Sequence, residues 1–171
     1  MSEYSPDFEK AHPNAKRLMD EEFFFSPIEE TGPFGNDDGA DCYAGFAQWR
    51  KNNLQENPHR YLAEQIDYWG YPSFNIAETD IEKLGPYLSH DSMASRYMTG
   101  IDAAIVAIAF GQLYLEGSIG VDFRETAKTA IRRELLPELL SLYPASYQET
   151  RKTQLEKMLF VLIQINPLRA V

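Results

Sequence analysis

Three aspartates that follow one asparagine are the side chains whose spacing could support chemistry in this chain. Asn36, Asp37, Asp38 and Asp41 lie within six residues, and the first and last aspartates, four residues apart, would share one face of a helix. A calcium loop of the common twelve-residue type needs glycine at position six and glutamate at position twelve, and counting from Asn36 these are Asp41 and Ala47. We therefore interpret Asp37 or Asp38 as a helix cap. A small metal-dependent or hydrolytic enzyme that uses the three aspartates is kept as an alternative.

The remaining nucleophiles and metal ligands are few and scattered. Cys42 is the only cysteine, and the three histidines are His12, His59 and His90, with no pair at the spacing of a zinc site. Cys42 lies on the apolar stripe of an expected helix, which favours a buried structural thiol over a nucleophile. The sequence has neither a Gly-x-Ser-x-Gly turn nor a phosphate-binding glycine loop with a following lysine. These observations predict a protein with no catalytic residues, no metal and no cofactor.

Asp102 stands at the start of the most apolar stretch of the chain, where a carboxylate is unexpected. A buried charge is tolerated only with a partner, so we expect an ion pair with Arg96, Arg124, Arg132 or Arg133. We interpret Asp102 as a structural residue in preference to a catalytic acid.

A run of carboxylates without neighbouring cations is the strongest feature of the sequence. Between Arg17 and Arg50 there is no Lys, Arg or His, and this stretch, called the acidic segment (residues 18–49), supplies −8 of the formal net charge of −10. Its eight carboxylates are Asp20, Glu21, Glu22, Glu29, Glu30, Asp37, Asp38 and Asp41. Such a segment suits a surface that receives a basic partner, although acidic runs are also common as solvated faces.

Aromatic residues are interleaved with these carboxylates. Aromatic side chains supply much of the binding energy of protein interfaces, so we expect Phe23 to Phe25 and Tyr43 to anchor a partner that the carboxylates steer. The alternative, in which these aromatics are ordinary core residues, stays open. The residues predicted to bind the partner are Glu21, Glu22, Phe24, Glu29, Glu30, Asp37, Asp38, Asp41 and Tyr43.

The composition is that of an ordinary globular protein. The chain has 171 residues, of which 44% are hydrophobic and 25% charged, and this predicts a single globular helical domain with an irregular N-terminal arm at about residues 1–13. A pI near 4.7 argues against binding to nucleic acid or to an anionic membrane surface. Ser2 to Lys10 lacks the apolar core of a signal peptide, and the apolar stretch 103–110 is too short to span a bilayer. We expect a cytoplasmic protein.

Apolar spacing and helix-start signals predict an all-α fold, a compact bundle of about six helices around a central apolar helix at about 92–116. No alternating strand pattern is longer than four residues. The other expected helices are 14–22, one from Asp37 or Asp38 to about 51, one from Asn57-Pro58 to Gly70, a short one from the Thr79 capping box to about Gly85-Pro86, one from Asp122 that Pro137 kinks or divides, and one from Ser146 to Ile165.

Two resemblances add to this interpretation. The stretch Thr31-Gly-Pro-Phe-Gly-Asn-Asp-Asp-Gly-Ala-Asp41 resembles the signature Gly-x-Phe-x-Asn-Asp-x-Ala-x-Asp of a family of small, uncharacterised bacterial helical proteins, over about a dozen residues. In size, acidity and lack of an active site the chain also resembles the immunity proteins of nuclease toxin systems. That second resemblance implies a protein that binds a basic toxin domain and covers its active site.

The sequence therefore leads to one main hypothesis and two alternatives. The main hypothesis is a non-enzymatic bacterial immunity protein that neutralises a basic antibacterial toxin domain, most simply a nuclease, through protein–protein interaction. The alternatives are the small enzyme at Asp37, Asp38 and Asp41, and a housekeeping scaffold protein.

Overall fold

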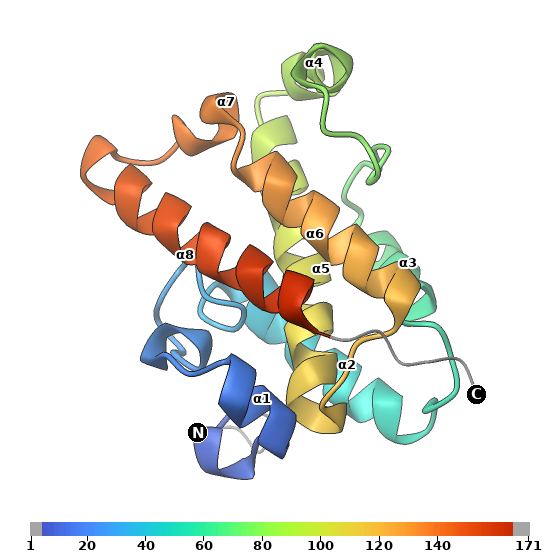
Figure 1. The fold of residues 1–171 in the computed structure, drawn as a ribbon. Coiled ribbons are helices and arrows are strands. Elements are labelled where there is room, and N and C mark those ends of the chain that lie inside the picture. Colours follow the sequence, from blue (N-terminus) through green and yellow to red (C-terminus); the bar gives the residue numbers. More distant parts are fainter. Residues whose placement is uncertain (1–4, 166–171) are drawn as a thin grey trace.

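Helix α5 (Ala94–Glu116) is the centre of the fold and is buried on nearly every face. The computed structural model describes residues 5–165, and Figure 1 shows α5 surrounded by the other long helices. Its sequence explains this position, because a helix that is apolar all round is stable only where its surface is kept from water. The helix α5 is also long enough and apolar enough to cross a membrane, but most of it is buried by the rest of the chain.

Three helices form the main layers around α5. Helix α2 (Asp37–Lys51) packs along one side of α5, helix α6 (Val121–Glu134) packs along another, and helix α8 (Ala145–Gln164) covers α6. The remaining elements are the 3-10 turns η1 (Phe8–Lys10) and η2 (Glu22–Phe24) and the helices α1 (Pro13–Leu18), α3 (Pro58–Trp69), α4 (Ile81–His90) and α7 (Pro137–Leu140). The described residues contain no strand, so the all-α prediction and the central apolar helix are confirmed.

Several predicted helix ends are also confirmed. Asn57 caps α3 by accepting from the His59 N–H, and Pro58 occupies the first helical position. Gly117 ends α5 in the left-handed conformation, with φ of 75°. Pro137 divides the last part of the chain, because α6 stops at Glu134 and α7 begins at the proline itself. The predicted cap of α2 is wrong, however: the cap is Asn36 and not Asp37 or Asp38, because the side-chain oxygen of Asn36 accepts from the Gly39 N–H.

Other predicted ends are wrong. The α4 helix does not close at Pro86 but continues to His90, since Leu84, Tyr87 and Leu88 pack in a small second core that offsets the lost backbone hydrogen bond. Its cap is Asp80 in place of Thr79. The capping boxes expected at Asp122 and Ser146 do not form; α6 and α8 begin one residue earlier and have no side-chain cap.

The N-terminal region is more regular than expected. Residues 1–4 of the predicted irregular arm lie outside the described residues, but Phe8–Lys10 form the 3-10 turn η1. The helix α1 that follows is shorter than predicted, because it ends at Leu18, four residues earlier. The His12 N–H donates to the Tyr114 carbonyl, and Ala11 is buried. The hydrogen bond from His12 holds this part of the chain against the C-terminal end of α5.

Candidate functional site: an acidic surface and the pocket beneath it

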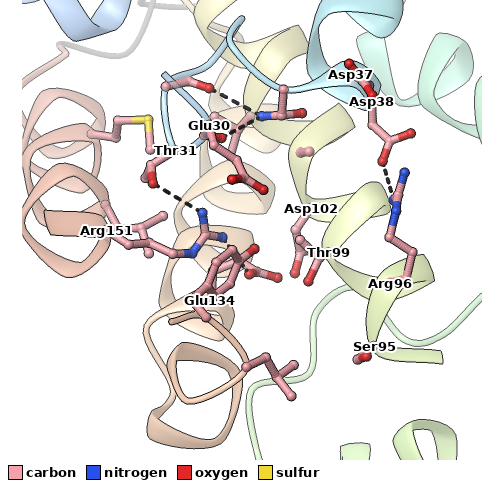
Figure 2. A pocket seen from close by; sticks show the side chains of 18 residues that line it. Glu30, Thr31, Asp37, Asp38, Ser95, Arg96, Thr99, Asp102, Glu134 and Arg151 are labelled. Carbon is pink, nitrogen blue, oxygen red and sulfur yellow. Dashed lines mark hydrogen bonds and ion pairs between the residues drawn. The ribbon is translucent and has the colours of Figure 1, made fainter. Parts of the chain in front are cut away.

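A pocket of about 390 Å³ lies where the acidic segment meets the bundle. Its walls come from residues 30–32 and 36–38, from the first half of α5, from the last residue of α6 and from α8 with the turn before it. Figure 2 shows Glu134 and Arg151 on one side of the pocket, the Asp38–Arg96 pair on the other, and Thr99 and Asp102 of α5 between them. The pocket therefore joins elements that are far apart in the sequence.

The ion pair predicted for Asp102 forms with Arg133, and it is completely enclosed. The two side chains are 1% and 0% exposed, and the guanidinium donates to both carboxylate oxygens, with the shortest N–O distance 2.5 Å. Arg133 also donates to the carbonyl groups of Ile76 and Glu78, which ties the loop before α4 to the core. Burial chiefly raises the pKa of Asp102, with the nearby Glu134 carboxylate acting in the same direction and Arg133 acting against it.

A second buried ion pair joins α6 to α8 at the wall of the pocket. Glu134 accepts from Arg151 at 2.9 Å, and the side chains are only 4% and 6% exposed. The Tyr143 ring lies 4.1 Å from the centre of the Arg151 guanidinium. Two buried atoms of this pair, Glu134 Oε1 and Arg151 Nε, have no hydrogen-bond partner among the described residues.

A chain of hydrogen bonds connects this ion pair to the acidic segment. Arg151 donates to the Thr31 hydroxyl at 3.4 Å, and Thr31 and Tyr147 share a hydrogen bond of 2.6 Å. The Tyr147 hydroxyl donates to Glu29 at 2.9 Å, so Thr31 is the donor to Tyr147. The loop at residues 29–31 is therefore held against α8.

On the opposite wall, Asp38 is held by two side chains. It forms an ion pair with Arg96 of α5 and accepts from the Tyr71 hydroxyl at 3.1 Å. Gly100 makes room for this group, because a Cβ there would lie 2.8 Å from atoms of all three side chains. The hydrogen bond to Asp38 is the main cause that raises the pKa of Arg96.

The pocket carries more negative than positive groups. Each of Asp102, Glu134 and Asp38 has an arginine partner, whereas Glu30 and Asp37 have no ion-pair partner among the described residues. Both unpaired carboxylates are exposed at the mouth. The rest of the wall is partly apolar and includes Ala103, Val106, Leu142, Leu155 and Met158. The excess charge therefore lies at the mouth, above a partly apolar interior.

The structure places most of the predicted partner-binding carboxylates on the surface. Asp20, Glu21, Glu22, Glu30, Asp37 and Asp41 are exposed, and Glu29 and Asp38 are half-buried. Three have partners: Glu21 pairs with Lys157 of α8, Asp38 pairs with Arg96, and Glu29 accepts from Tyr147. The other five carboxylates have no ion pair within residues 5–165.

Two of the predicted aromatic anchors, Phe24 and Tyr43, lie inside the protein, whereas Phe23 and Phe25 are half-buried against the core. Phe24 packs against Phe110 of α5, and Tyr43 packs against Phe34 and Tyr114. Both side chains are buried, so the core interpretation that the sequence had left open applies to them. An apolar side chain that sequence reasoning missed takes their place on the surface: Ile28, in the middle of the acidic segment, is 87% exposed.

The cysteine is buried, and the three aspartates of the cluster lie in different surroundings. Cys42 is buried, as predicted, and burial raises the pKa of its thiol, which disfavours the reactive thiolate. Asp38 is turned to Arg96 and Tyr71, while Asp37 and Asp41 are exposed. Residues 5–165 contain no group of three His, Cys, Asp or Glu side chains that could hold a metal ion.

Sequence reasoning also missed Glu134 and Arg151, although a signal for both exists. Glu134 continues the apolar stripe of α6 after Phe123, Ala127 and Ala130, and Arg151 begins the stripe of α8 before Leu155 and Met158. A charged residue in register with an apolar stripe must find a partner inside the protein. The two stripes face each other across α6 and α8, and this register predicts the pair.

Comparisons with protein-family models, with curated proteins and with solved structures found no match to this chain. What the protein does must therefore be argued from its own residues.

Proposed function

We propose that this protein is a non-enzymatic interaction protein that binds a basic protein domain, and that it acts as an immunity protein against a nuclease-type toxin. The observation that carries the proposal is the set of exposed, unpaired carboxylates of the acidic segment: Asp20, Glu22, Glu30, Asp37 and Asp41. Unpaired surface carboxylates repel one another and are costly to keep together, so a cationic partner surface would gain from covering them.

Two features of the fold support a docking role for this surface. The loop at residues 29–31 is fixed to α8 through Tyr147 and Thr31, and α2 is capped by Asn36. A surface that is ordered before binding loses less entropy when a partner docks. Ile28 then supplies an exposed apolar contact among the charges.

The nuclease class follows from the chemistry of the partner. An enzyme that cleaves nucleic acid needs a cationic cleft for the phosphates. The exposed carboxylates of the acidic segment would occupy that cleft in place of phosphates, which blocks the substrate and selects the partner by charge. In its size and acidity, the chain also resembles the immunity proteins of nuclease toxin systems.

Charge reversal tests this proposal. The partner would first be captured from the host with this protein as bait and eluted by a salt gradient, and we expect one basic domain whose nuclease activity the protein inhibits. The triple variant Glu30→Lys, Asp37→Lys, Asp41→Lys should then slow association by about tenfold or more and flatten its salt dependence, since close charges mainly set the association rate. These three side chains are exposed and have no structural partner within the described residues, so the fold should tolerate the change.

A matched control carries the same change in net charge elsewhere. Asp67, Glu138 and Glu149 are exposed and lie on α3, α7 and α8, outside the acidic segment. Their reversal to lysine should change the association rate much less. Equal slowing in both triple variants would mean that only net charge matters, and the assignment of the binding surface would be wrong.

A further inference from the structure

We infer that the pocket beneath the acidic surface receives a single cationic group on a carbon chain, a guanidinium or an ammonium, which donates to Glu134 at its inner end. In the partner proposed above, this group is an arginine or lysine side chain, so the inference rests in that respect on the proposed function. Three independent features of the pocket lead to it.

The first feature is a buried acceptor without a donor. Glu134 lines the pocket with a side chain that is 4% exposed, and its Oε1 atom has no hydrogen-bond partner within residues 5–165. Buried carboxylate oxygens in native proteins are nearly always hydrogen-bonded, because leaving one unsatisfied costs its desolvation energy. The Oε2 atom is already engaged by Arg151, so Oε1 is the atom that is available to a further donor.

The second feature is the charge at the entrance. Glu30 and Asp37 are exposed, line the pocket and have no ion-pair partner among the described residues. They attract a cation and disfavour an anion at the mouth. The arginines of the pocket do not reverse this preference, because Arg96 and Arg151 are paired with Asp38 and Glu134.

The third feature is the apolar part of the pocket wall. Leu142, Ala103, Val106, Leu155 and Met158 line the pocket together with its carboxylates. Apolar side chains beside carboxylates fit the carbon chain of an arginine or lysine, which buries its methylene groups and keeps its charge on polar partners. A compact inorganic cation would leave this wall unused, and residues 5–165 hold no cluster of metal-ligand side chains.

A proton held between Asp102 and Glu134 is the competing explanation of the free oxygen. Glu134 raises the pKa of Asp102 both by its charge and by a side-chain hydrogen bond, in which a protonated Asp102 would be the donor to Glu134 from within the chain. In that case Glu134 would need no cation from outside the chain. A binding experiment distinguishes the two explanations, because only the first predicts that cations bind in the pocket.

The experiment titrates the full chain with butylguanidinium and butylammonium at low ionic strength, with the neutral butylurea as the matched probe, by calorimetry and by amide chemical shifts. We expect saturable binding of the cations at one site, shifts centred on residues 95–106, and no binding of butylurea. Glu134→Gln should weaken the binding of butylguanidinium by about tenfold or more, which is the effect expected from the loss of one charge-assisted hydrogen bond. Equal binding of butylurea, or unchanged binding in Glu134→Gln, would overturn the inference.

Two further variants keep the test valid if Glu134→Gln does not fold. Ala103→Leu extends a side chain into the pocket and leaves every charged group in place, and it should abolish binding. The double variant Glu30→Gln, Asp37→Asn should weaken binding several-fold, whereas Asp41→Asn, on the same helix as Asp37 but outside the pocket, should not. Binding that survives Ala103→Leu would show that the cation lies elsewhere.

The source of the cation is distinguished by a second pair of probes. Arginine blocked at both ends as N-acetyl-arginine methylamide mimics a residue of a protein, and free arginine mimics a small metabolite. Binding of the blocked form supports a partner side chain, and exclusion of it while free arginine binds would overturn that assignment. If the triple charge reversal weakens binding of the partner and Ala103→Leu does not, the proposed function stands and the pocket inference fails. Weakening by Ala103→Leu with no effect of the triple reversal would contradict both, because Glu30 and Asp37 also line the pocket.

Discussion

Buried charged residues hold this protein together at the points where its helices meet. Asp102 with Arg133 joins α5 to α6, and Glu134 with Arg151 joins α6 to α8. Arg133 and Glu134 are neighbours in the sequence, so the two pairs form one cluster of alternating charge. Removing one member of such a cluster leaves an uncompensated buried charge, which is strongly destabilising.

Asp102 should make stability depend on pH in an unusual direction. Because burial raises its pKa in the folded state, its contribution is fully present below the ordinary carboxyl pKa and is lost as the pH rises through the folded pKa. The wild type should therefore lose stability relative to Asp102→Asn as the pH rises above about 4, with a slope of at most about 1.4 kcal/mol per pH unit.

Urea unfolding of both proteins between pH 4 and pH 8 checks this prediction, because carboxylates that do not interact with Asp102 cancel in the difference. A difference that is constant over this range would mean that Asp102 is ionised throughout. If Asp102→Asn does not fold, the carboxyl carbon shift of Asp102 in the wild type reports the same pKa directly.

At the scale of elements, the turns decide how closely the helices meet. The turn between α5 and α6 contains two glycines, of which one needs the absence of a side chain and the other does not. Gly117 has a positive φ of 75°, and a Cβ there would lie 2.1 Å from the ring of His12. Gly120 is the cap of α6, has an ordinary φ of −57° and has open space around it.

Substitutions at these two glycines should therefore have opposite effects. Gly117→Ala should destabilise the protein by about 1–2 kcal/mol from backbone strain alone, and by more because His12 must move. Gly120→Ser should stabilise it by about 0.5–1 kcal/mol, since a serine hydroxyl can cap the first turn of α6. Thermal unfolding of both variants tests the pair, and a loss of stability in Gly120→Ser would contradict this account of the turn.

At the scale of the whole molecule, the core divides the acidic segment into an inner and an outer side. Phe24 and Tyr43 turn to α5 and its neighbours, while Ile28 and the unpaired carboxylates turn outwards. The segment thus closes the core and forms the proposed binding surface at once. Its inner residues contribute to stability, and its outer residues form the surface that we propose binds the partner.

Alanine substitutions on the two sides of the segment separate these roles. Phe24→Ala removes a buried ring and should cost about 3–5 kcal/mol of stability. Ile28→Ala, at an exposed position in the same segment, should change stability by less than about 0.5 kcal/mol. Urea unfolding measures both effects, and Ile28→Ala should instead weaken binding of the partner. A large loss of stability in Ile28→Ala would place that side chain in the core.

The sequence alone was sufficient for the helical class, for the central helix and for the partner requirement of Asp102. These follow from local rules: apolar spacing predicts helices, an all-round apolar helix must be central, and a buried carboxylate needs a cation. Cys42 on an apolar stripe was correctly predicted as a buried thiol for the same reason.

Only the tertiary structure decided which arginine pairs with Asp102, which aromatics of the acidic segment are buried, and where the pocket lies. Arg96, Arg124, Arg132 and Arg133 are equivalent in the sequence, and only the packing angle of α6 on α5 brings Arg133 to Asp102. Phe24 and Ile28 are both apolar residues in an acidic segment, and which one is covered depends on the path of the loop over α5. The pocket unites four separate parts of the chain, so no local pattern contains it. Contacts between distant residues depend on how the helices pack. The sequence specifies that packing only through the combined interactions of all the helices and loops, and no single segment contains it.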